Sequence, residues 1–283
     1  MIISTDSTAN LPKEYYEKLN IRMIPMQINF DDNTYNDLSE DLPVEEYYQR
    51  MRDGSTPTTS QINEFRAREY LEELLKSGED ILHIGFSSAL SGSTSTMKRL
   101  ADEYNEKNKN KNKIIVIDSL NAASGEGLLV LKAHDLMQEG KSIDEIAEEI
   151  NSLIPHACSY FTVEQLKYLV RGGRVSKMSG MLGTLLNIKP VLRVDEQGRL
   201  VSYRKIISRR KAISELKKIC SEKIADKKYV FINHAVCLED AENLAKALKD
   251  ELGVNPIITD LTQVIGCHTG PGLLALFFFG KEK

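Results

Sequence analysis

The feature that most constrains the fold is a repeated order of apolar strand, polar turn and helix in the first half of the chain. Residues 2–5, 80–86 and 113–118 are short and apolar, and each leads into a turn and then a segment with helical periodicity. Strands that alternate with helices in this way predict a parallel sheet flanked by helices. Ligands of such sheets gather at the carboxyl ends of the strands. A binding site is therefore expected in the turns that follow them.

The second half of the chain has a different pattern. Strands are expected at 158–163, 229–233 and 256–260, and the segments 191–194 and 200–206 flank a turn typical of a hairpin. With 283 residues, the chain is longer than one hydrophobic core usually serves. We predict an α/β protein of two domains. Residues 1–155 would form an N-terminal parallel sheet flanked by helices, and residues 156–283 a C-terminal α/β domain with a mixed sheet. Helices are expected at 13–19, with Asn10 as a cap, and at 43–51, 63–76, 93–108, 127–138, 142–153, 208–223 and 239–252.

Charge and cysteine content argue against several classes of protein. The net charge is −4, and the densest basic cluster spans only eight residues, from Arg204 to Lys211, which is too short to follow a phosphate backbone. We therefore expect no nucleic-acid partner. The four cysteines form no C-x-x-C pair and have no histidines at zinc spacing. We expect no metal site, and reduced thiols in a cytoplasmic protein.

No membrane-spanning segment is expected. Residues 1–6 lack the basic and apolar regions of a signal peptide. Residues 261–280 carry no charge, but polar residues, glycine and proline interrupt them, and the apolar part is only 273–279. A segment of that length suits a buried strand and is too short to cross a bilayer. A transient contact with a membrane surface is left open.

Two near-matches to catalytic motifs each lack a required glycine. Gly140-Lys141-Ser142 resembles the end of a phosphate-binding loop, but Asp135 stands where that loop needs a glycine. A helix end followed by a cap explains this tripeptide. Gly85-Phe86-Ser87-Ser88-Ala89 resembles a nucleophile elbow that ends in alanine. It leaves a serine hydrolase, acting through Ser87 or Ser91, as an alternative function.

Serine, threonine and glycine concentrate in three polar turns. Their hydroxyls, the free backbone N–H groups at a helix start and one imidazole, His268, together suit a small anion. A carboxylate fits best, because no guanidinium cluster or metal-ligand set accompanies them, and a protonated His268 would add a charge-assisted bond. Ordinary capped turns are the alternative explanation. His83, by contrast, lies in an apolar strand and is expected in the core. The turns are residues 56–61, residues 87–93 and a loop at residues 266–272.

Five blocks of the sequence carry a family resemblance. They are Thr5-Asp6-Ser7-Thr8-Ala9-Asn10, Thr58-Thr59-Ser60-Gln61, Ser87-Ser88-Ala89-Leu90-Ser91-Gly92-Ser93, Leu169-Val170-Arg171-Gly172-Gly173-Arg174-Val175-Ser176 and Gly266-Cys267-His268-Thr269-Gly270-Pro271-Gly272. In this order they resemble the DegV family, the fatty-acid-binding subunits of bacterial fatty acid kinase. Two departures are small: Ser93 replaces the usual threonine and keeps a hydroxyl, and Asn63 stands where the family often has serine or proline.

The resemblance implies a two-domain protein that holds one long-chain fatty acid in a buried tunnel between and within the domains. Candidate tunnel walls are 178–188 and 273–279, although plain core would look the same in sequence. Arg171, Arg174 and Arg209 would lie at the rim or on a kinase-docking surface, with a surface ion pair as the alternative. The carboxyl group would be bound at the domain junction by Thr59, Ser60, Ser91, Gly92, Ser93, His268 and Thr269.

The resemblance also implies a lipid carrier in phospholipid metabolism, which is not itself an enzyme. A partner, the ATP-dependent fatty acid kinase subunit, would convert the bound carboxylate to an acyl phosphate. The sequence shows no P-loop, kinase glycine-rich loop or acidic magnesium cluster, so we expect no ATP binding and no cofactor in this chain. A dihydroxyacetone-kinase-like enzyme, in which His268 holds a carbonyl substrate, is the second alternative function.

Overall fold

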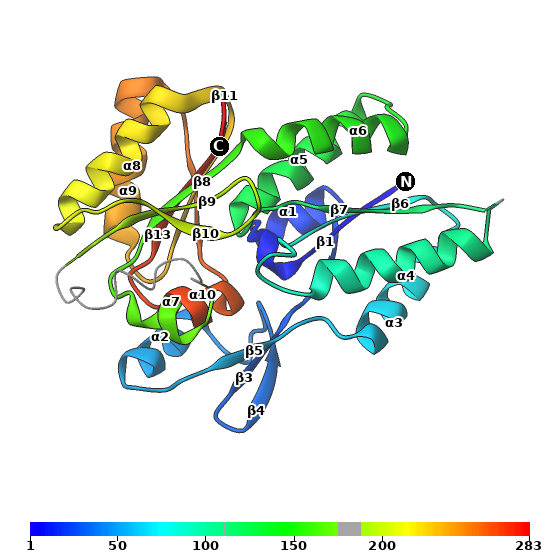
Figure 1. The fold of residues 1–283 in the computed structure, drawn as a ribbon, viewed down its shortest axis with the longest axis horizontal. Coiled ribbons are helices and arrows are strands. Elements are labelled where there is room, and N and C mark those ends of the chain that lie inside the picture. The colour runs from blue at the N-terminus through cyan, green and yellow to red at the C-terminus, as the bar shows by residue number, and fades with distance from the viewer. Residues whose placement is uncertain (110, 175–187) are drawn as a thin grey trace.

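The computed structural model describes residues 1–109, 111–174 and 188–283, and Figure 1 shows their arrangement. A parallel sheet lies at the centre of the N-terminal half. Two helices cover one face of it and two cover the other (Figure 1), as the alternation of strands and helices predicts. The strands, in spatial order, are β2 (Arg22–Ile24), β1 (Ile2–Asp6), β6 (Ile81–Gly85) and β7 (Ile114–Asp118). The helices are α5 (Ser124–Gln138) and α6 (Ile143–Leu153) on one face, and α3 (Glu64–Leu75) and α4 (Ser93–Lys107) on the other.

Local sequence explains where these helices begin. Asn63 caps α3 by accepting a hydrogen bond from the Arg66 N–H, 3.0 Å away. Ser142 opens α6 with a capping box, as predicted. The prediction that Asn10 caps the next helix, α1 (Lys13–Lys18), is wrong, because Pro12 occupies that position. Asn10 has a left-handed backbone (φ 51°), and its side chain bonds to residues 260 and 262 instead.

A small antiparallel sheet separates β1 from β6 along the chain. Residues 22–30 form two strands, β2 and β3, which are separated at Pro25. Asp31 and Asp32 then form a two-residue turn with φ of 45° and 64°, the geometry of a type I′ hairpin. The sheet order is β4 (Asn33–Asn36), β3 (Gln27–Phe30) and β5 (Thr58–Ser60), and α2 (Val44–Arg52) lies between β4 and β5 in the chain.

The C-terminal half contains the predicted mixed sheet. Its strand pairs are antiparallel except for one parallel pair, β11 with β12. Helices α8 (Arg209–Lys223) and α9 (Leu238–Leu252) share a hydrophobic core with this sheet, and α5 packs on it from the N-terminal half. The strands, in spatial order, are β10 (Leu200–Arg204), β9 (Val191–Val194), β8 (Ala157–Thr162), β13 (Leu274–Gly280), β11 (Ile224–His234) and β12 (Ile257–Asp260). The described strands before Pro155 form the first two sheets and those after it the third. The division into domains at residue 155 stays a prediction.

One short helix returns from the C-terminal half to the N-terminal half. The prediction of a loop at residues 266–272 is wrong for most of these residues. Helix α10 (Gln263–Thr269) includes the first four of them, and only Gly270 to Gly272 form a turn. The glycines at 270 and 272 have φ of 76° and 82°, so this turn needs residues without a Cβ. Helix α10 contacts α2, β3 and β5, and also α7 (Lys167–Arg171).

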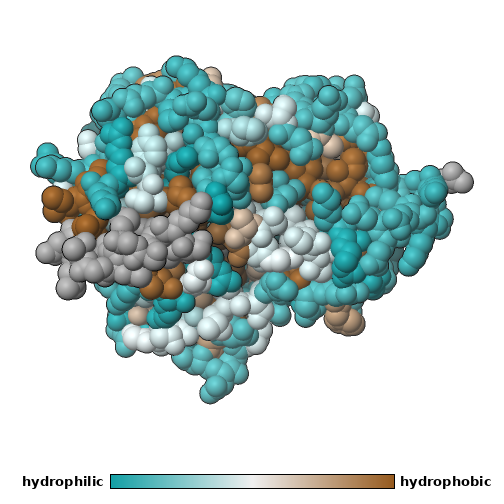
Figure 2. All heavy atoms as spheres, viewed as in Figure 1, coloured by the Kyte–Doolittle hydropathy of each residue, from teal (hydrophilic) through white to brown (hydrophobic). Residues whose placement is uncertain are grey.

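The surface in Figure 2 is mostly hydrophilic, with hydrophobic residues visible between the two halves of the molecule. In the part of the chain that the structure describes, no helix combines the length and the apolar character needed to cross a membrane. The uncharged stretch 261–280 instead forms the short helix α10 and the buried strand β13.

Candidate functional site

A pocket of about 500 Å³ lies where the two halves of the chain meet. This volume falls in the range of sites that bury small organic ligands. Its walls are largely aliphatic and aromatic, and they come from both halves. The apolar lining residues include Met26, Phe86, Leu90, Phe161, Val194, Leu200, Leu261, Val264, Ile265, Leu273, Ala275 and Phe277.

Strand β13 supplies one wall through alternate residues. Leu273, which immediately precedes the strand, lines the pocket, as do Ala275 and Phe277 within it. The role of 273–279 as a tunnel wall stays a prediction. The neighbouring strand β8 presents Phe161 opposite Ala275, and Ser159 opposite Phe277. The other predicted wall, 178–188, lies outside the described residues except for Ile188.

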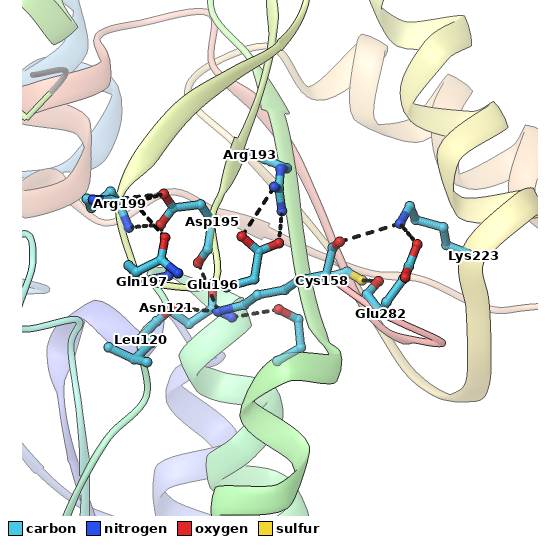
Figure 3. A network of polar contacts seen from close by, with 12 residues as sticks. Leu120, Asn121, Cys158, Arg193, Asp195, Glu196, Gln197, Arg199, Lys223 and Glu282 are labelled. Carbon is cyan, nitrogen blue, oxygen red and sulfur yellow. Dashed lines mark hydrogen bonds and ion pairs between the residues drawn. The ribbon is translucent and has the colours of Figure 1, made fainter. Parts of the chain in front are cut away.

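The hairpin of β9 and β10 closes another side of the pocket through Val194 and Leu200. Figure 3 shows the polar contacts around its turn, where Arg199 Nε donates to Asp195 Oδ2 at 3.0 Å. The Ser87 hydroxyl, at the carboxyl end of β6, donates to the Gly198 carbonyl at 2.8 Å. Ser87 therefore fixes the hairpin turn against the N-terminal half.

A pair of polar side chains marks one end of the pocket. Thr59 Oγ1 lies 2.9 Å from His268 Nε2, although the two residues are 209 positions apart in the chain. Strand β5 brings the threonine and α10 brings the histidine. Ser91 and Gly92, at the start of α4, line the pocket too, as does Thr269, whose hydroxyl donates to the Ile265 carbonyl at 3.1 Å.

Two predicted site residues do not line the pocket. Ser60 follows Thr59 in β5, so its side chain points to the opposite face of the strand, where it accepts a hydrogen bond from Asn29 Nδ2 at 3.0 Å. The Ser93 side chain is buried, and its Oγ accepts a bond from the Ile62 N–H at 3.0 Å. Ser93 thus holds the segment after β5 against the start of α4.

The imidazole of His268 is neutral at pH 7. Burial, followed by the positive charge of Arg174, lowers the pKa of His268 to about 4. The charge-assisted bond that a protonated His268 would form with a carboxylate stays a prediction. The Nδ1 edge of the ring lies against Gly172, where a Cβ would come within 2.5 Å of Nδ1.

The three candidate arginines have different environments. Arg174 lines the pocket beside its polar end, and its Nε donates to the Leu90 carbonyl at 3.4 Å. The exposed Arg171 stacks over the Tyr168 ring at 5.3 Å. Arg209 does not line the pocket; its Nε donates to Asp240 Oδ2 at 2.9 Å at the start of α8.

Buried carboxyl groups beside the pocket were missed by the sequence analysis. Asp6 ends β1 and accepts hydrogen bonds from the Thr8 and Phe86 N–H groups, at 2.9 and 3.1 Å. The Glu126 carboxyl accepts from the Thr5 hydroxyl at 2.8 Å. Burial raises the pKa of Asp6 and Glu126, and it raises that of Asp37 to about 7. An acidic residue at the carboxyl end of a predicted strand was the available signal for Asp6.

The hydroxyls required by the hydrolase alternative have other partners. Ser87 is fully buried and bonds to the hairpin turn, as described above. Ser91 Oγ lies 3.0 Å from Ser93 Oγ. His83, as predicted, is a buried core residue, and its Nδ1 lies 2.9 Å from Ser4 Oγ. These hydrogen bonds give no support to a serine nucleophile activated by histidine.

Comparison with known proteins identifies the family. A family model described as "Uncharacterised protein, DegV family" matches residues 1–281. The chain belongs to the DegV family. A DegV domain-containing protein from Clostridium perfringens is 39% identical over 286 residues, covering 100% of this chain and 98% of the relative. A Thermus thermophilus DegV protein, whose structure is named for fatty acid binding, is 29% identical with a TM-score of 0.88, and 99% of each chain is covered. A stearic-acid-binding protein from Eubacterium ventriosum is 25% identical, with a TM-score of 0.88 and 99% coverage of each chain.

The DegV sequence blocks converge on the pocket. The blocks at residues 58–61, 87–93 and 266–272 contribute Thr59, Gly92 and His268, respectively, to the lining of the pocket. The block around residues 169–176 places Gly172 against the histidine ring. The opening block lies behind the pocket wall, where Asp6 binds the Phe86 N–H.

Proposed function

We propose that this DegV protein binds one long-chain fatty acid, with its tail in the apolar pocket and its carboxyl group beside Thr59 and His268. The observation that carries the proposal is the 2.9 Å contact between these two side chains in a pocket whose walls are largely apolar. The fatty acids named for the two DegV structures above support the same ligand class.

The polar end provides donors for a carboxylate. In the neutral tautomer that carries its proton on Nε2, His268 donates to Thr59 Oγ1 and leaves the threonine proton free to bind the ligand; in the other tautomer Thr59 donates to Nε2. The backbone N–H of Gly92, which lines the pocket, is a further candidate donor. A negative charge beside His268 would raise the pKa of the imidazole and favour its protonation. A carboxylate that is removed from water needs such partners.

The apolar walls account for affinity. Each buried methylene contributes about 0.8 kcal/mol, so about a dozen contribute on the order of 10 kcal/mol. Loss of translational freedom and ordering of the chain offset several kcal/mol of this. The net binding free energy allows tight binding with few polar contacts, which suits the largely apolar lining of this pocket.

We further propose that the protein presents the bound carboxyl group to a separate ATP-dependent kinase in the cytoplasm. A carboxylate oxygen would attack the γ-phosphorus of ATP, giving an acyl phosphate and ADP. The exposed side chains of Arg171 and Arg174 support docking of an anionic reactant at this end of the pocket. Arg209 is kept as a docking candidate farther from the pocket.

Two experiments test these proposals. Organic extraction of the purified protein, followed by mass spectrometry, should release one fatty acid per chain. Delipidated protein that fails to bind stearic acid in a competition assay would contradict the carrier function.

For the kinase step, the loaded protein is incubated with ATP and Mg²⁺, with and without the kinase from the same cell. Acyl phosphate should form only with the kinase; its formation by this chain alone would contradict the division of roles.

A further inference from the structure

Helix α10 carries two residues of the proposed carboxyl site but is held by the opposite half of the chain. The Thr262 N–H, just before the helix, donates to Asn10 Oδ1 at 2.7 Å. The Tyr47 hydroxyl donates to the Gln263 carbonyl at 3.0 Å, and Gln263 Nε2 donates to the Leu42 carbonyl at 2.7 Å. The position of His268 therefore depends on contacts with residues distant in sequence.

Asp37 is the ionisable member of this set, and it contacts the start of the helix directly. Its Oδ1 accepts a hydrogen bond from the Val264 N–H at 3.2 Å, near the start of α10, although 227 residues separate the two. The helix has no side-chain cap from Thr262, the residue at its N-cap position. Asp37 fills that role from another part of the chain.

The same carboxyl group also fixes a second wall of the pocket. Asp37 Oδ2 accepts from the Ser7 hydroxyl at 2.8 Å, and Ser7 Oγ in turn accepts from the Met26 N–H at 3.0 Å. The Asp37 N–H donates to the Met26 carbonyl at 2.8 Å. Met26 and Val264 both line the pocket, so one side chain sets the relative position of two walls.

We infer that Asp37 is a positioning residue for fatty-acid binding, which holds α10, and with it His268, at the distance from Thr59 that the carboxyl group requires. This inference rests on the proposed function. Asp37 is only 2% exposed and lies behind the wall, so it acts through α10 rather than on the ligand. It is distinct from Thr59 and His268, which would touch the carboxylate.

The two hydrogen bonds predict different results for two substitutions. Asp37→Ala removes both acceptors, which releases the start of α10. In Asp37→Asn, the amide oxygen still accepts from the Val264 N–H, and the amide nitrogen donates to Ser7 Oγ, which has a second lone pair. The asparagine variant should therefore restore most of the function that the alanine variant loses.

The test compares stearic acid affinity, thermal unfolding and the imidazole NMR signals of His268 in the full-length protein, well below the unfolding temperature. Asp37→Ala should weaken binding about tenfold and shift the His268 signals. Asp37→Asn should stay within about threefold of wild type. The control is Asp53→Ala, which alters an exposed carboxyl at the end of α2 and should change neither the stearic acid affinity nor the His268 signals.

Wild-type affinity and unchanged His268 signals in Asp37→Ala, with only a lower unfolding temperature, would overturn the inference. If that variant does not fold, Ser7→Ala replaces it, because it removes one of the two bonds and should give a smaller shift in the same direction. Unaltered binding and signals in folded Ser7→Ala would then overturn the inference. A wild-type protein that binds no stearic acid would contradict the proposed function, whereas the His268 signals test the positioning role independently of ligand.

Discussion

Replacing Gly172 with alanine should weaken fatty-acid binding by moving His268. The added Cβ would lie 2.5 Å from His268 Nδ1, and ordinary contacts begin near 3.4 Å, so the ring has to move by about 0.9 Å or displace its neighbours. The backbone of Gly172 is in the α region (φ −67°), so the substitution causes no direct backbone strain. The effect is therefore a steric one on the imidazole.

The magnitude follows from the contact between His268 and Thr59. At 2.9 Å it is a normal hydrogen bond, and a ring displacement of about 0.9 Å is larger than the roughly 0.5 Å range over which such bonds keep good geometry. Loss of one such bond costs about 1–1.5 kcal/mol. This corresponds to a roughly five- to tenfold rise in the dissociation constant for stearic acid.

Gly173→Ala provides a matched control one position along the chain. Gly173 has φ of 70°, and a Cβ there would meet no atom within 4 Å. Alanine at this position strains the backbone by about 1 kcal/mol and leaves the pocket unchanged. Competition with a fluorescent fatty acid and thermal unfolding, measured on both variants, should show loss of affinity in Gly172→Ala and loss of stability alone in Gly173→Ala. Equal affinities in the two variants would refute the reasoning.

Three further predictions follow from the same geometry. Thr59→Val should weaken stearic acid binding about tenfold, whereas Ser60→Ala should have little effect, because only Thr59 faces the pocket; equal effects in a competition assay would contradict this. Burial lowers the folded-state pKa of His83 and His268 to about 4 from a usual value near 6.5, so the stability from keeping them neutral should be present above about pH 6.5 and lost as the pH falls toward 4. Urea unfolding across this range should show the decline, and a flat profile would count against it. Burial raises the pKa of Glu126, so the stability gained by keeping this carboxyl neutral is lost as the pH rises through the raised pKa. In urea unfolding at increasing pH, Glu126→Gln should therefore lose less free energy of unfolding than wild type does. Parallel curves for the two proteins would contradict this.

The parallel sheet could be predicted from the sequence because its central strands, β1 and β6, are buried on both faces. Strand β6 is buried at every position, which gives the continuous apolar run that marks it in the sequence. The hairpin of β3 and β4 was missed because Asp31 and Asp32 look like an ordinary polar turn, and their positive φ values are visible only in the structure. Strand β4 is also mostly exposed and has no hydrophobic pattern.

The site was predictable in its composition but not in its geometry. The block at residues 58–61 indicated both Thr59 and Ser60 as site residues. Only the pairing of β5 with β3 shows which of the two faces the pocket. The loop expected around His268 is helical, because contacts with distant residues such as Asp37 hold it in place. Periodicity within one segment cannot reveal an interaction across 227 residues.

The most direct test of the account is a crystal structure of the protein loaded with stearic acid. One molecule should lie in the pocket, with its carboxyl group within hydrogen-bond distance of Thr59 Oγ1 and its tail between β13 and the β9–β10 hairpin. A fatty acid bound in the reverse direction, with its carboxyl group beside Ser159 and its tail against His268, would contradict it.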